Sequence, residues 1–554
     1  MMRLGASAGA AATRSAGVAA TRSAGGLADL GLPSTPHRLM RRVASPDRGS
    51  LSAALAAPSE GHPTRSATDR ILRPTLPELW TFLAAALPVC AALLATLPTV
   101  DLAYQLRAGA EILAGRGIPA TDTWTFTAAG RPWLDQQWGA QAVLASAFTA
   151  TGWTGLAVLR AALVGAISGL ILAAIRQRAP EMRPRTAALL TLAAFVVASP
   201  ALALRPQLLG MALFAVTLLI LAGRRQRPAW LWLLPAIAMV WANMHGSFIL
   251  APVLVGLACL EDLRRGAPIA RRAAALTALT AAATVITPFG IGVWEYALGL
   301  ATNQEVTARI SEWQPPTFGS AFGALFWISV VLVALSAGMI TRRAGRIPWV
   351  AVLTLGAFVV LGAVAERGIA WWPGVAAVTL AGLGADGKQP VRPSGIARPA
   401  RGSVLNSAIV VVLVLVGIAL IPAWRPVDSG LNAPSGLLGQ APSGVTAALR
   451  GVATRTDRIW NPQVWGSWFE FAVPEPSYAF DARIEVIPPE AWADGDVVAS
   501  AGAGWPAILD RADATIVITE GDATSPLAQA LAEDSNWRLA HADDTGTIWV
   551  RADR

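Results

Sequence analysis

Three aspartates, Asp101, Asp122 and Asp135, stand in a polar stretch between two hydrophobic segments. The stretch runs from Thr99 to Trp138 and also carries arginine and tryptophan residues. A carboxylate at a membrane surface can act as a general base toward the hydroxyl group of a second substrate. The three aspartates are therefore the first candidates for catalytic residues.

Each aspartate also has a structural interpretation. Asp101 begins a segment with leucines at helical spacing, which predicts an amphipathic helix lying along the membrane surface. In the first turn of that helix, the carboxylate would complement the helix dipole. Asp122 would cap a turn, and the tryptophans beside Asp135 are typical of anchors at the membrane interface. Both interpretations stay open for each aspartate.

Arginines form the second group of candidates. A guanidinium group binds phosphate through two parallel hydrogen bonds, and a polyprenyl phosphate head group would lie at the membrane surface. Arg160 lies inside a hydrophobic span, where a charge is costly and indicates either function or snorkelling to the interface. The predicted phosphate or lipid-donor site consists of Arg160, Arg205, Arg309 and Arg367.

Asn243 and His245 are supporting candidates, because the segment WANMHGSF turns outward between two predicted spans. A lone histidine at the end of a span is also typical of a hydrogen-bonded structural group. The chain contains four histidines and two cysteines, and both cysteines lie in apolar spans. We therefore expect neither a disulfide framework nor a cofactor, and a divalent metal would need a tighter carboxylate cluster.

The composition indicates the class of protein that positions these residues. Hydrophobic residues make up 54% of the chain and charged residues only 14%, against about 25% charged in soluble domains. The apolar residues come in blocks of about the length that crosses a ~30 Å hydrocarbon core. We predict an all-α polytopic membrane protein with a small exported C-terminal α/β domain. The eleven expected spans are at about 78–98, 154–175, 187–204, 208–222, 229–244, 247–260, 273–287, 320–340, 348–365, 369–384 and 404–424.

Basic residues predict the orientation of the spans. Of the 44 Lys and Arg residues, 28 lie in the N-terminal region or in alternate loops, as expected for cytoplasmic segments. The N-terminus is therefore predicted to be cytoplasmic and the C-terminal domain to be outside. The two long loops, 99–138 and 288–319, are then predicted on the outer face. This charge distribution argues against a nucleic-acid partner.

Three regions follow from this organisation. Residues 1–76 are rich in Ala, Ser, Arg, Gly and Pro and lack the apolar core of a signal peptide, so a disordered cytoplasmic tail or a misassigned start is expected. Residues 77–425 form the predicted transmembrane domain. Residues 426–554 contain 18 acidic residues and eight arginines, as suits an exported domain. The predicted strands there are RIW, SWFEFAV, YAFDARIEV, ATIVITE and TIWVRA, and the predicted helices are GVTAALRGVA, DVVASAGAGWPAILDRA and SPLAQALAED.

The spacing of residues from Asp101 to Trp138 resembles an uncharacterised group of bacterial membrane proteins that is similar to the GT-C glycosyltransferases. The segments LRPQ, WANMHGSF, TPFG and SEWQPP follow in the matching order, as do W-G-x-W and F-D-x-R near the C-terminus. The resemblance covers most of residues 78–490. It implies a GT-C-like fold, a bacterial cytoplasmic membrane, a polyprenyl-phosphate sugar donor and inversion at the anomeric carbon. It also implies that Asp101 is the best match for the catalytic base and Asp135 the second.

Two positions depart from the group. Gln105 stands where the group usually has a histidine, and Gln136 and Gln137 stand where it usually has His-Glu. Glutamine cannot accept a proton as a base, so these replacements favour a chain that is impaired or uses another acceptor. Gln105 and Gln137 are accordingly counted as supporting site residues.

Three functions fit the sequence. The first is a membrane glycosyltransferase that moves a sugar from a polyprenyl-phosphate donor to an exported glycan, lipid or protein. The second is a non-catalytic scaffold or binding protein in cell-envelope assembly. The third is a transporter, which ranks last because no matching pair of broken spans indicates an inverted repeat.

Overall fold

The computed structural model describes residues 73–266, 270–345, 347–386 and 402–554. All of them belong to one compact unit, Arg65–Arg554. The predicted tail, except for residues 73–76, and the whole of the predicted basic loop Lys388–Arg401 lie outside the described residues.

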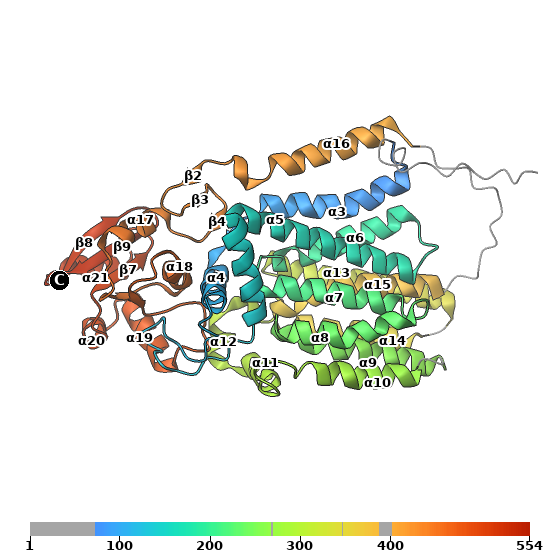
Figure 1. Cartoon of the computed structure of the whole chain (residues 1–554), viewed down its shortest axis with the longest axis horizontal. Helices are drawn as coiled ribbons and strands as arrows, with labels where there is room; N and C mark the ends of the chain where they lie inside the picture. The colour runs from blue at the N-terminus through green and yellow to red at the C-terminus, as the bar shows by residue number, and fades with distance from the viewer. Residues whose placement is uncertain (1–72, 267–269, 346, 387–401) are drawn as a thin grey trace, which may run out of the picture. The chain divides into compact units, whose positions relative to one another are not determined.

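Long helices running side by side form the main body of the described chain (Figure 1). They are apolar over most of their length, so their side chains pack against one another and toward lipid. Each expected span overlaps one helix. The helices are α3 (Leu76–Leu94), α5 (Trp138–Arg178), α6 (Pro184–Ala198), α7 (Pro206–Ala222), α8 (Leu234–Ala242), α9 (Leu250–Arg264), α10 (Ala270–Ala283), α13 (Ala321–Ala344), α14 (Trp349–Val364), α15 (Trp372–Asp386) and α16 (Val404–Ala419).

Among the described residues, six helices are long and apolar enough to cross a membrane, and four further apolar helices have 10–17 residues. The chain is therefore a membrane protein, but the predicted count of eleven spans is not confirmed. The helix α10 is in neither group. It has 14 residues, but it is less apolar, with two arginines directly after its first residue. Proline and 3-10 turns shorten other helices, as at Pro228–Leu233 before α8.

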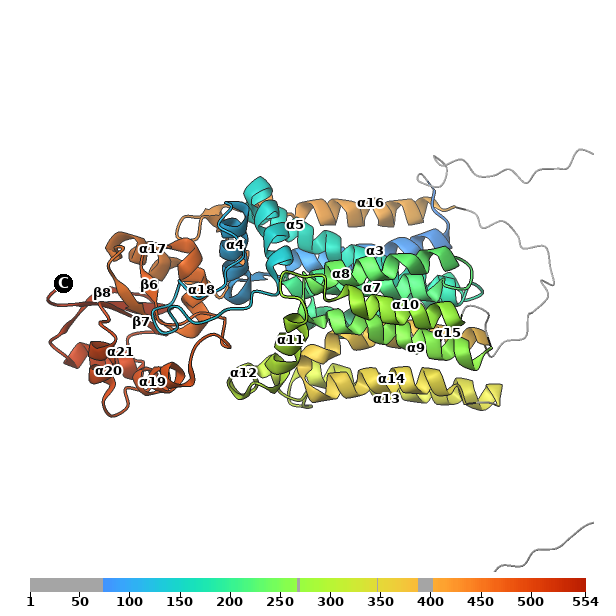
Figure 2. The same ribbon diagram turned by 60° about the horizontal axis from the view of Figure 1, so that its bottom comes forward.

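The polar stretch after α3 folds across one end of the bundle. Its first part is α4 (Thr99–Leu113), the predicted amphipathic helix, which buries Leu102, Ala103 and Leu106. It packs against the first part of α5, as Figure 2 shows. The helix α5 begins at Trp138, earlier than the predicted span, and bends at Gly152, where φ is 63°. Glycine adopts this φ without a steric penalty, so the chain can turn there into the bundle.

A second polar segment lies at the same end of the bundle (Figure 2). It contains α11 (Gly292–Thr302), α12 (Gln304–Arg309) and the 3-10 turn η4 (Ser311–Trp313). Asn303 caps α12 by accepting hydrogen bonds from the backbone N–H groups of Glu305 and Val306. This segment and α4 supply part of the candidate site, and the remaining residues come from the turns before α7 and α15.

The C-terminal segment contains a five-stranded sheet with the order β6-β5-β7-β9-β8. The strand β5 pairs in parallel with β6 and β7, whereas β9 pairs antiparallel with β7 and β8. The strands are β5 (Arg458–Trp460), β6 (Ser477–Tyr478), β7 (Ile516–Glu520), β8 (Trp537–Ala542) and β9 (Gly546–Arg551). The helices are α17 (Ser443–Val452), α18 (Gln463–Ala472), α19 (Pro489–Ala499), α20 (Trp505–Arg511) and α21 (Pro526–Glu533). The prediction of mixed helices and strands is confirmed.

Two of the predicted strands are wrong. SWFEFAV forms most of α18, because Trp465, Trp468 and Phe469 repeat at helical spacing and are all buried. YAFDARIEV contributes only Tyr478 to a strand, and the residues after it make an irregular turn around Arg483. The strand β8 was not predicted, because most of its side chains are exposed at the edge of the sheet and do not alternate.

Short strand pairs and a loop join the C-terminal segment to the helical part. The strand β1 (Leu97–Pro98), directly after α3, pairs in parallel with β4 (Leu438–Gly439). The pair β2 (Val427–Asp428) and β3 (Ala433–Pro434) follows α16. The Phe126 N–H also donates to the carbonyl oxygen of Tyr478 at 2.9 Å. The first polar loop is thus built against the C-terminal sheet.

Candidate functional site

Two carboxylates and two guanidinium groups meet at the end of the bundle that carries α4. Asp101 lies in the first turn of α4, and its Oδ2 is 3.2 Å from Nε of Arg205. Arg205 directly precedes α7 and contacts both carboxylate oxygens of Glu312, at 2.7 and 2.9 Å. Arg367, in the 3-10 turn η5 (Glu366–Trp371), donates from Nε to the same carboxylate at 3.0 Å. We call Asp101, Arg205, Glu312 and Arg367 the charged cluster.

The charged cluster is accessible to a ligand, because its four side chains are between 23% and 34% exposed. Burial acts to raise the pKa of Glu312, but the charges of Arg367 and Arg205 outweigh it and lower that pKa below its usual value. Glu312 is therefore ionised, and its single negative charge is shared between the two arginines. The Arg367 guanidinium also lies 5.2 Å from the ring centroid of Trp313, which fixes its orientation.

Two half-buried tyrosines and a half-buried glutamate lie beside the charged cluster. Burial and the neighbouring Asp101 and Glu485 raise the pKa of Tyr104, one turn along α4, well above its usual value. The hydroxyl of Tyr296, on α11, donates to Oε1 of Glu485 at 3.1 Å. Burial raises the pKa of Glu485 as well. The site thus holds neutral phenol groups that can donate hydrogen bonds.

Asp135 lies just before α5 and is almost completely buried. Its Oδ1 accepts a hydrogen bond from Nε2 of Gln141 at 2.7 Å. Among the described residues, its Oδ2 has no hydrogen-bond partner. Burial raises the pKa of Asp135 to about 7, only partly opposed by Gln141 and by the charge of Arg483. Such a carboxyl can release or accept a proton near neutral pH.

His245 precedes and caps the 3-10 turn η3 (Gly246–Ile249), and its imidazole is neutral. Its Nδ1 accepts a hydrogen bond from the backbone N–H of Ser247 at 3.1 Å. Burial and the charge of Arg367 lower the pKa of His245 to about 3. The proton of the ring therefore sits on Nε2, and the electrostatic effect of Arg367 links His245 to the charged cluster.

The glutamines that depart from the resembled group are neighbours in space. Nε2 of Gln105, on α4, donates to Oε1 of Gln137 at 2.9 Å. Gln136 donates to the carbonyl oxygen of Ala242 at 2.6 Å. Gln105 and Gln137 therefore form one amide pair between α4 and the start of α5. The third glutamine, Gln136, binds the end of α8.

Four of the predicted site residues contact other parts of the protein and not the charged cluster. They are Asn243, Arg309, Arg160 and Asp122. Asn243 accepts from Nε1 of Trp138 at 2.9 Å and donates to the carbonyl oxygens of Met239 and Ile286, so it joins α5 to α8 and to the chain after α10. Arg309 makes two hydrogen bonds to Asp496, at 3.1 and 2.8 Å, and thereby ties α12 to α19. Both lie outside the charged cluster.

Arg160 does not fit the predicted role in phosphate binding. It is buried inside α5 and donates to the carbonyl oxygens of Ala92 and Ala95, both at 2.5 Å, and of Thr96. These carbonyl groups are at the end of α3, where a helix leaves its last acceptors without intrahelical partners. In the structure, the partner of this charge is the end of α3.

Asp122 likewise belongs to a buried junction. Its carboxylate accepts from Thr125 Oγ1 at 2.6 Å and from Nη2 of Arg483 at 2.5 Å. The Arg483 guanidinium also binds Asp481 and lies 4.3 and 4.4 Å from the ring centroids of Trp124 and Trp133. The structural interpretation of Asp122 is thus favoured, since no exposed surface of its carboxylate remains.

Sequence reasoning did not select several residues that complete the site. Glu312 lies in the segment SEWQPP, and the paired arginines could have indicated that a carboxylate must face them. Glu485 follows the F-D-x-R segment, and only the fold brings it to Tyr296. In the part of the chain that the structure describes, no group of three or more His, Cys, Asp or Glu residues could hold a metal ion.

Two crystal structures of the oligosaccharyltransferase from Archaeoglobus fulgidus are similar to this chain. The form tethered with an acceptor peptide containing the NVT sequon via a disulfide bond has a TM-score of 0.49 and 11% identity, over 84% of this chain and 74% of that chain. The apo form has a TM-score of 0.45 and 12% identity, over 80% and 68%. No family model and no curated protein matches the chain. A similarity at this level assigns neither substrate nor mechanism.

Proposed function

We propose that this chain is a membrane glycosyltransferase that moves a sugar from a polyprenyl-phosphate donor to an exported glycan, lipid or protein. One observation carries the proposal: at one end of a membrane bundle, an accessible carboxylate, Asp101, lies beside Arg205, and Glu312 joins Arg205 to a second guanidinium group, that of Arg367. Sugar transfer from a lipid phosphate needs both a base and cations for the leaving phosphate.

In the proposed reaction, the acceptor hydroxyl attacks the anomeric carbon of the sugar. The new bond joins the acceptor oxygen to that carbon, while the bond from the carbon to the phosphate oxygen breaks. Asp101 takes the proton of the hydroxyl, and the leaving phosphate keeps the electron pair. Attack from the face opposite the phosphate inverts the anomeric carbon. Arg205 and Arg367 stabilise the charge that develops on the phosphate.

In the state without a donor, Glu312 binds both arginines of the charged cluster. Its carboxylate occupies Arg205 and Arg367 when no donor is bound, at 2.7 and 3.0 Å. A donor phosphate would take its place. Two guanidinium groups would bind it more strongly as the sugar–phosphate bond breaks, because the leaving phosphate then gains a second negative charge. Glu312 lies in η4, on the segment between α12 and α13, so its displacement would move that segment.

The placement in the membrane is part of the same proposal. The charged cluster faces the outer side of a bacterial cytoplasmic membrane, the N-terminus is cytoplasmic, and the C-terminal segment is outside. The positive-inside distribution of Lys and Arg supports this orientation. In it, the C-terminal segment adjoins the site through the junction of Asp122 and Arg483.

Asp101→Asn tests the proposal directly. The amide keeps the size of the side chain but cannot accept a proton, so sugar transfer should be abolished while the amount of folded protein is unchanged. Asp513→Asn is the matched control, because that carboxylate is 80% exposed and its ion pair is with Arg458, outside the charged cluster. Mass spectrometry of lipid-linked sugars and envelope glycans is the readout. Transfer at the wild-type rate by Asp101→Asn refutes the assignment.

A second candidate function has one observation in its favour. The hydrogen bond between Gln105 and Gln137 joins two amides at positions where the resembled group carries ionisable side chains. An amide pair holds α4 and α5 together but transfers no proton, which suits a non-catalytic scaffold in envelope assembly. A deletion strain with unchanged envelope glycans and unchanged lipid-linked sugars would favour this scaffold over the enzyme.

A further inference from the structure

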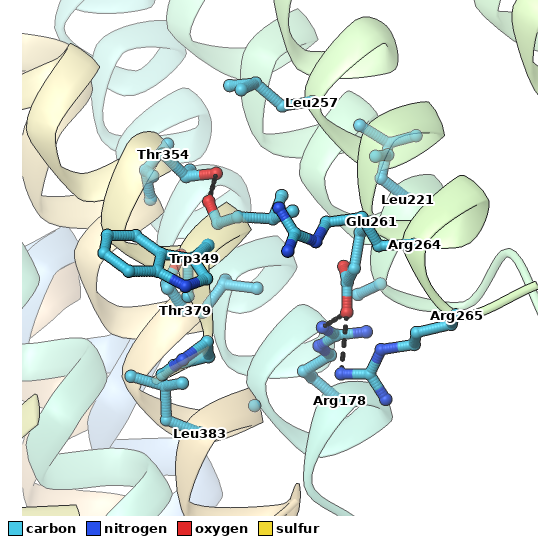
Figure 3. Close-up of a pocket in the computed structure, with 18 of the residues that line it drawn as sticks. Arg178, Leu221, Leu257, Glu261, Arg264, Arg265, Trp349, Thr354, Thr379 and Leu383 are labelled. Carbon is cyan, nitrogen blue, oxygen red and sulfur yellow. Dashed lines mark hydrogen bonds and ion pairs between the residues drawn. The ribbon is translucent and has the colours of Figure 1, made fainter. Parts of the chain in front are cut away.

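Figure 3 shows a cavity of about 310 Å³ in the helical bundle. It lies at the opposite end of α7 from the charged cluster. The helix α7 connects the two places. Arg205 precedes its first residue, whereas Leu221 and Ala222 at its end line the cavity. With a rise of 1.5 Å per residue, 17 residues separate the two sites by about 25 Å. The cavity is therefore independent of the proposed donor site.

The cavity combines an apolar wall with a basic rim. Its wall is formed by α7, α9 and α15 and includes Leu218, Leu254, Leu257 and Val375. Its rim carries four arginines and one glutamate: Arg178, Arg224, Arg264, Arg265 and Glu261. An apolar wall below a cationic rim fits a molecule with a hydrocarbon chain and an anionic head group.

Glu261 forms ion pairs with three of these arginines. Its carboxylate lies 2.5 Å from Arg178, 2.9 Å from Arg224 and 3.1 Å from Arg265. Arg264 differs from them. Within the described residues, its guanidinium has no ion pair or hydrogen bond, and Figure 3 shows its side chain extending into the cavity on the side of Trp349.

The start of α14 adds backbone donors to the rim. Trp349, Val350 and Ala351 are its first residues, and all three line the cavity. Pro348 precedes them and supplies no side-chain cap. The first N–H groups of a helix and its positive dipole end attract anions, phosphate in particular. The guanidinium of Arg264 and the N-terminus of α14 thus face each other across the cavity.

We propose that this cavity binds an anionic phospholipid, with its phosphate between Arg264 and the start of α14 and an acyl chain along the apolar wall. Basic pockets between membrane helices recognise lipid head groups in this way. A free phosphate ion would use only the rim and leave the apolar wall of α7, α9 and α15 facing water. An anionic phospholipid contacts both, because its phosphate binds the basic rim and its acyl chain covers the apolar wall.

The test uses the full chain in nanodiscs of phosphatidylcholine with a small fraction of phosphatidylglycerol. Native mass spectrometry counts the phosphatidylglycerol molecules that stay bound after release from the nanodisc. Arg264→Gln should weaken retention of phosphatidylglycerol about tenfold, because one charge-assisted contact is lost. The fold should be unaffected, since this side chain is exposed and has no protein partner among the described residues.

Arg272→Gln is the matched control. Arg272 is also exposed and lies near the start of α10, but it does not line the cavity. Its removal should leave phosphatidylglycerol retention unchanged. An equal loss in both variants, or no loss in Arg264→Gln, overturns the proposal. Displacement of phosphatidylglycerol by inorganic phosphate at equal concentration also overturns it, because the apolar wall would then contribute nothing.

Discussion

The buried carboxyl of Asp135 makes the stability of the protein depend on pH. Its pKa is about 7 in the folded chain, against about 4 in an unfolded one. Because the folded pKa is raised, its contribution to stability is fully present below about pH 4 and is lost as the pH rises through 7. Asp135→Asn removes this titration and is the perturbation that tests it.

The expected magnitude follows from the displaced pKa. One unit of pKa difference corresponds to about 1.4 kcal/mol, so ionisation of Asp135 costs the fold about 1.5 kcal/mol at pH 5 and about 4 kcal/mol at pH 8. Asparagine can still accept the hydrogen bond from Gln141. However, its amide nitrogen would stand where Oδ2 has no hydrogen-bond partner among the described residues, at a cost of about 1–3 kcal/mol.

These terms predict a change of sign with pH. Asp135→Asn should be about as stable as the wild type, or slightly less stable, near pH 5 and more stable by about 1–3 kcal/mol near pH 8. The assay is the free energy of unfolding of the purified chain in mild detergent, from titrations with sodium dodecyl sulfate across this pH range. Asp513→Asn, at an exposed position, is the control and should show no such trend.

A pH-independent difference between Asp135→Asn and the wild type would refute the reasoning. It would mean that the carboxyl is solvated in solution and that burial does not raise its pKa. The same result would remove Asp135 as a proton-transferring group near neutral pH, which is the property that supports its catalytic candidacy.

Three further changes test other contacts. Arg160→Met should destabilise the chain by about 2–4 kcal/mol in the same titration, because the carbonyl groups at the end of α3 lose their donors; an unchanged stability contradicts the capping role. Glu312→Gln should strengthen binding of a polyprenyl phosphate about tenfold, measured by isothermal titration calorimetry, because the resident anion is gone; weaker binding would show that Glu312 assists the donor instead. Arg483→Lys should expose the first polar loop to hydrogen exchange, because lysine cannot bind Asp122 and Asp481 while lying between two indole rings; unchanged exchange at Trp124 would contradict this.

The helices of the bundle could be predicted from the sequence, because apolar composition and length report directly on membrane burial. The bend in α5 could not. Its first part, from Trp138, is apolar on the face that packs against α4, and only the φ of Gly152 separates it from the part that enters the bundle. The prediction therefore began the span after the bend.

The candidate site was predicted in part for a similar reason. Asp101, Arg205 and Arg367 could be selected because charges are rare next to apolar spans. Their grouping with Glu312 depends on η4 and η5, whose positions no local pattern specifies. Arg160 has the same sequence signature as these residues. Its partners are backbone carbonyl groups, which are invisible in a sequence because every residue has one.

The two ends of the bundle differ in how an anion would bind. At the charged cluster, a phosphate must displace Glu312 from Arg205 and Arg367, so binding exchanges one anion for another. At the cavity, a phosphate would join Arg264, whose charge no described residue offsets. The charged cluster would favour a phosphate over weaker anions, because a ligand must displace Glu312 there. The cavity would bind any anionic head group, because no anion has to leave Arg264. The difference suits a selective donor site at one end of α7 and a general lipid site at the other.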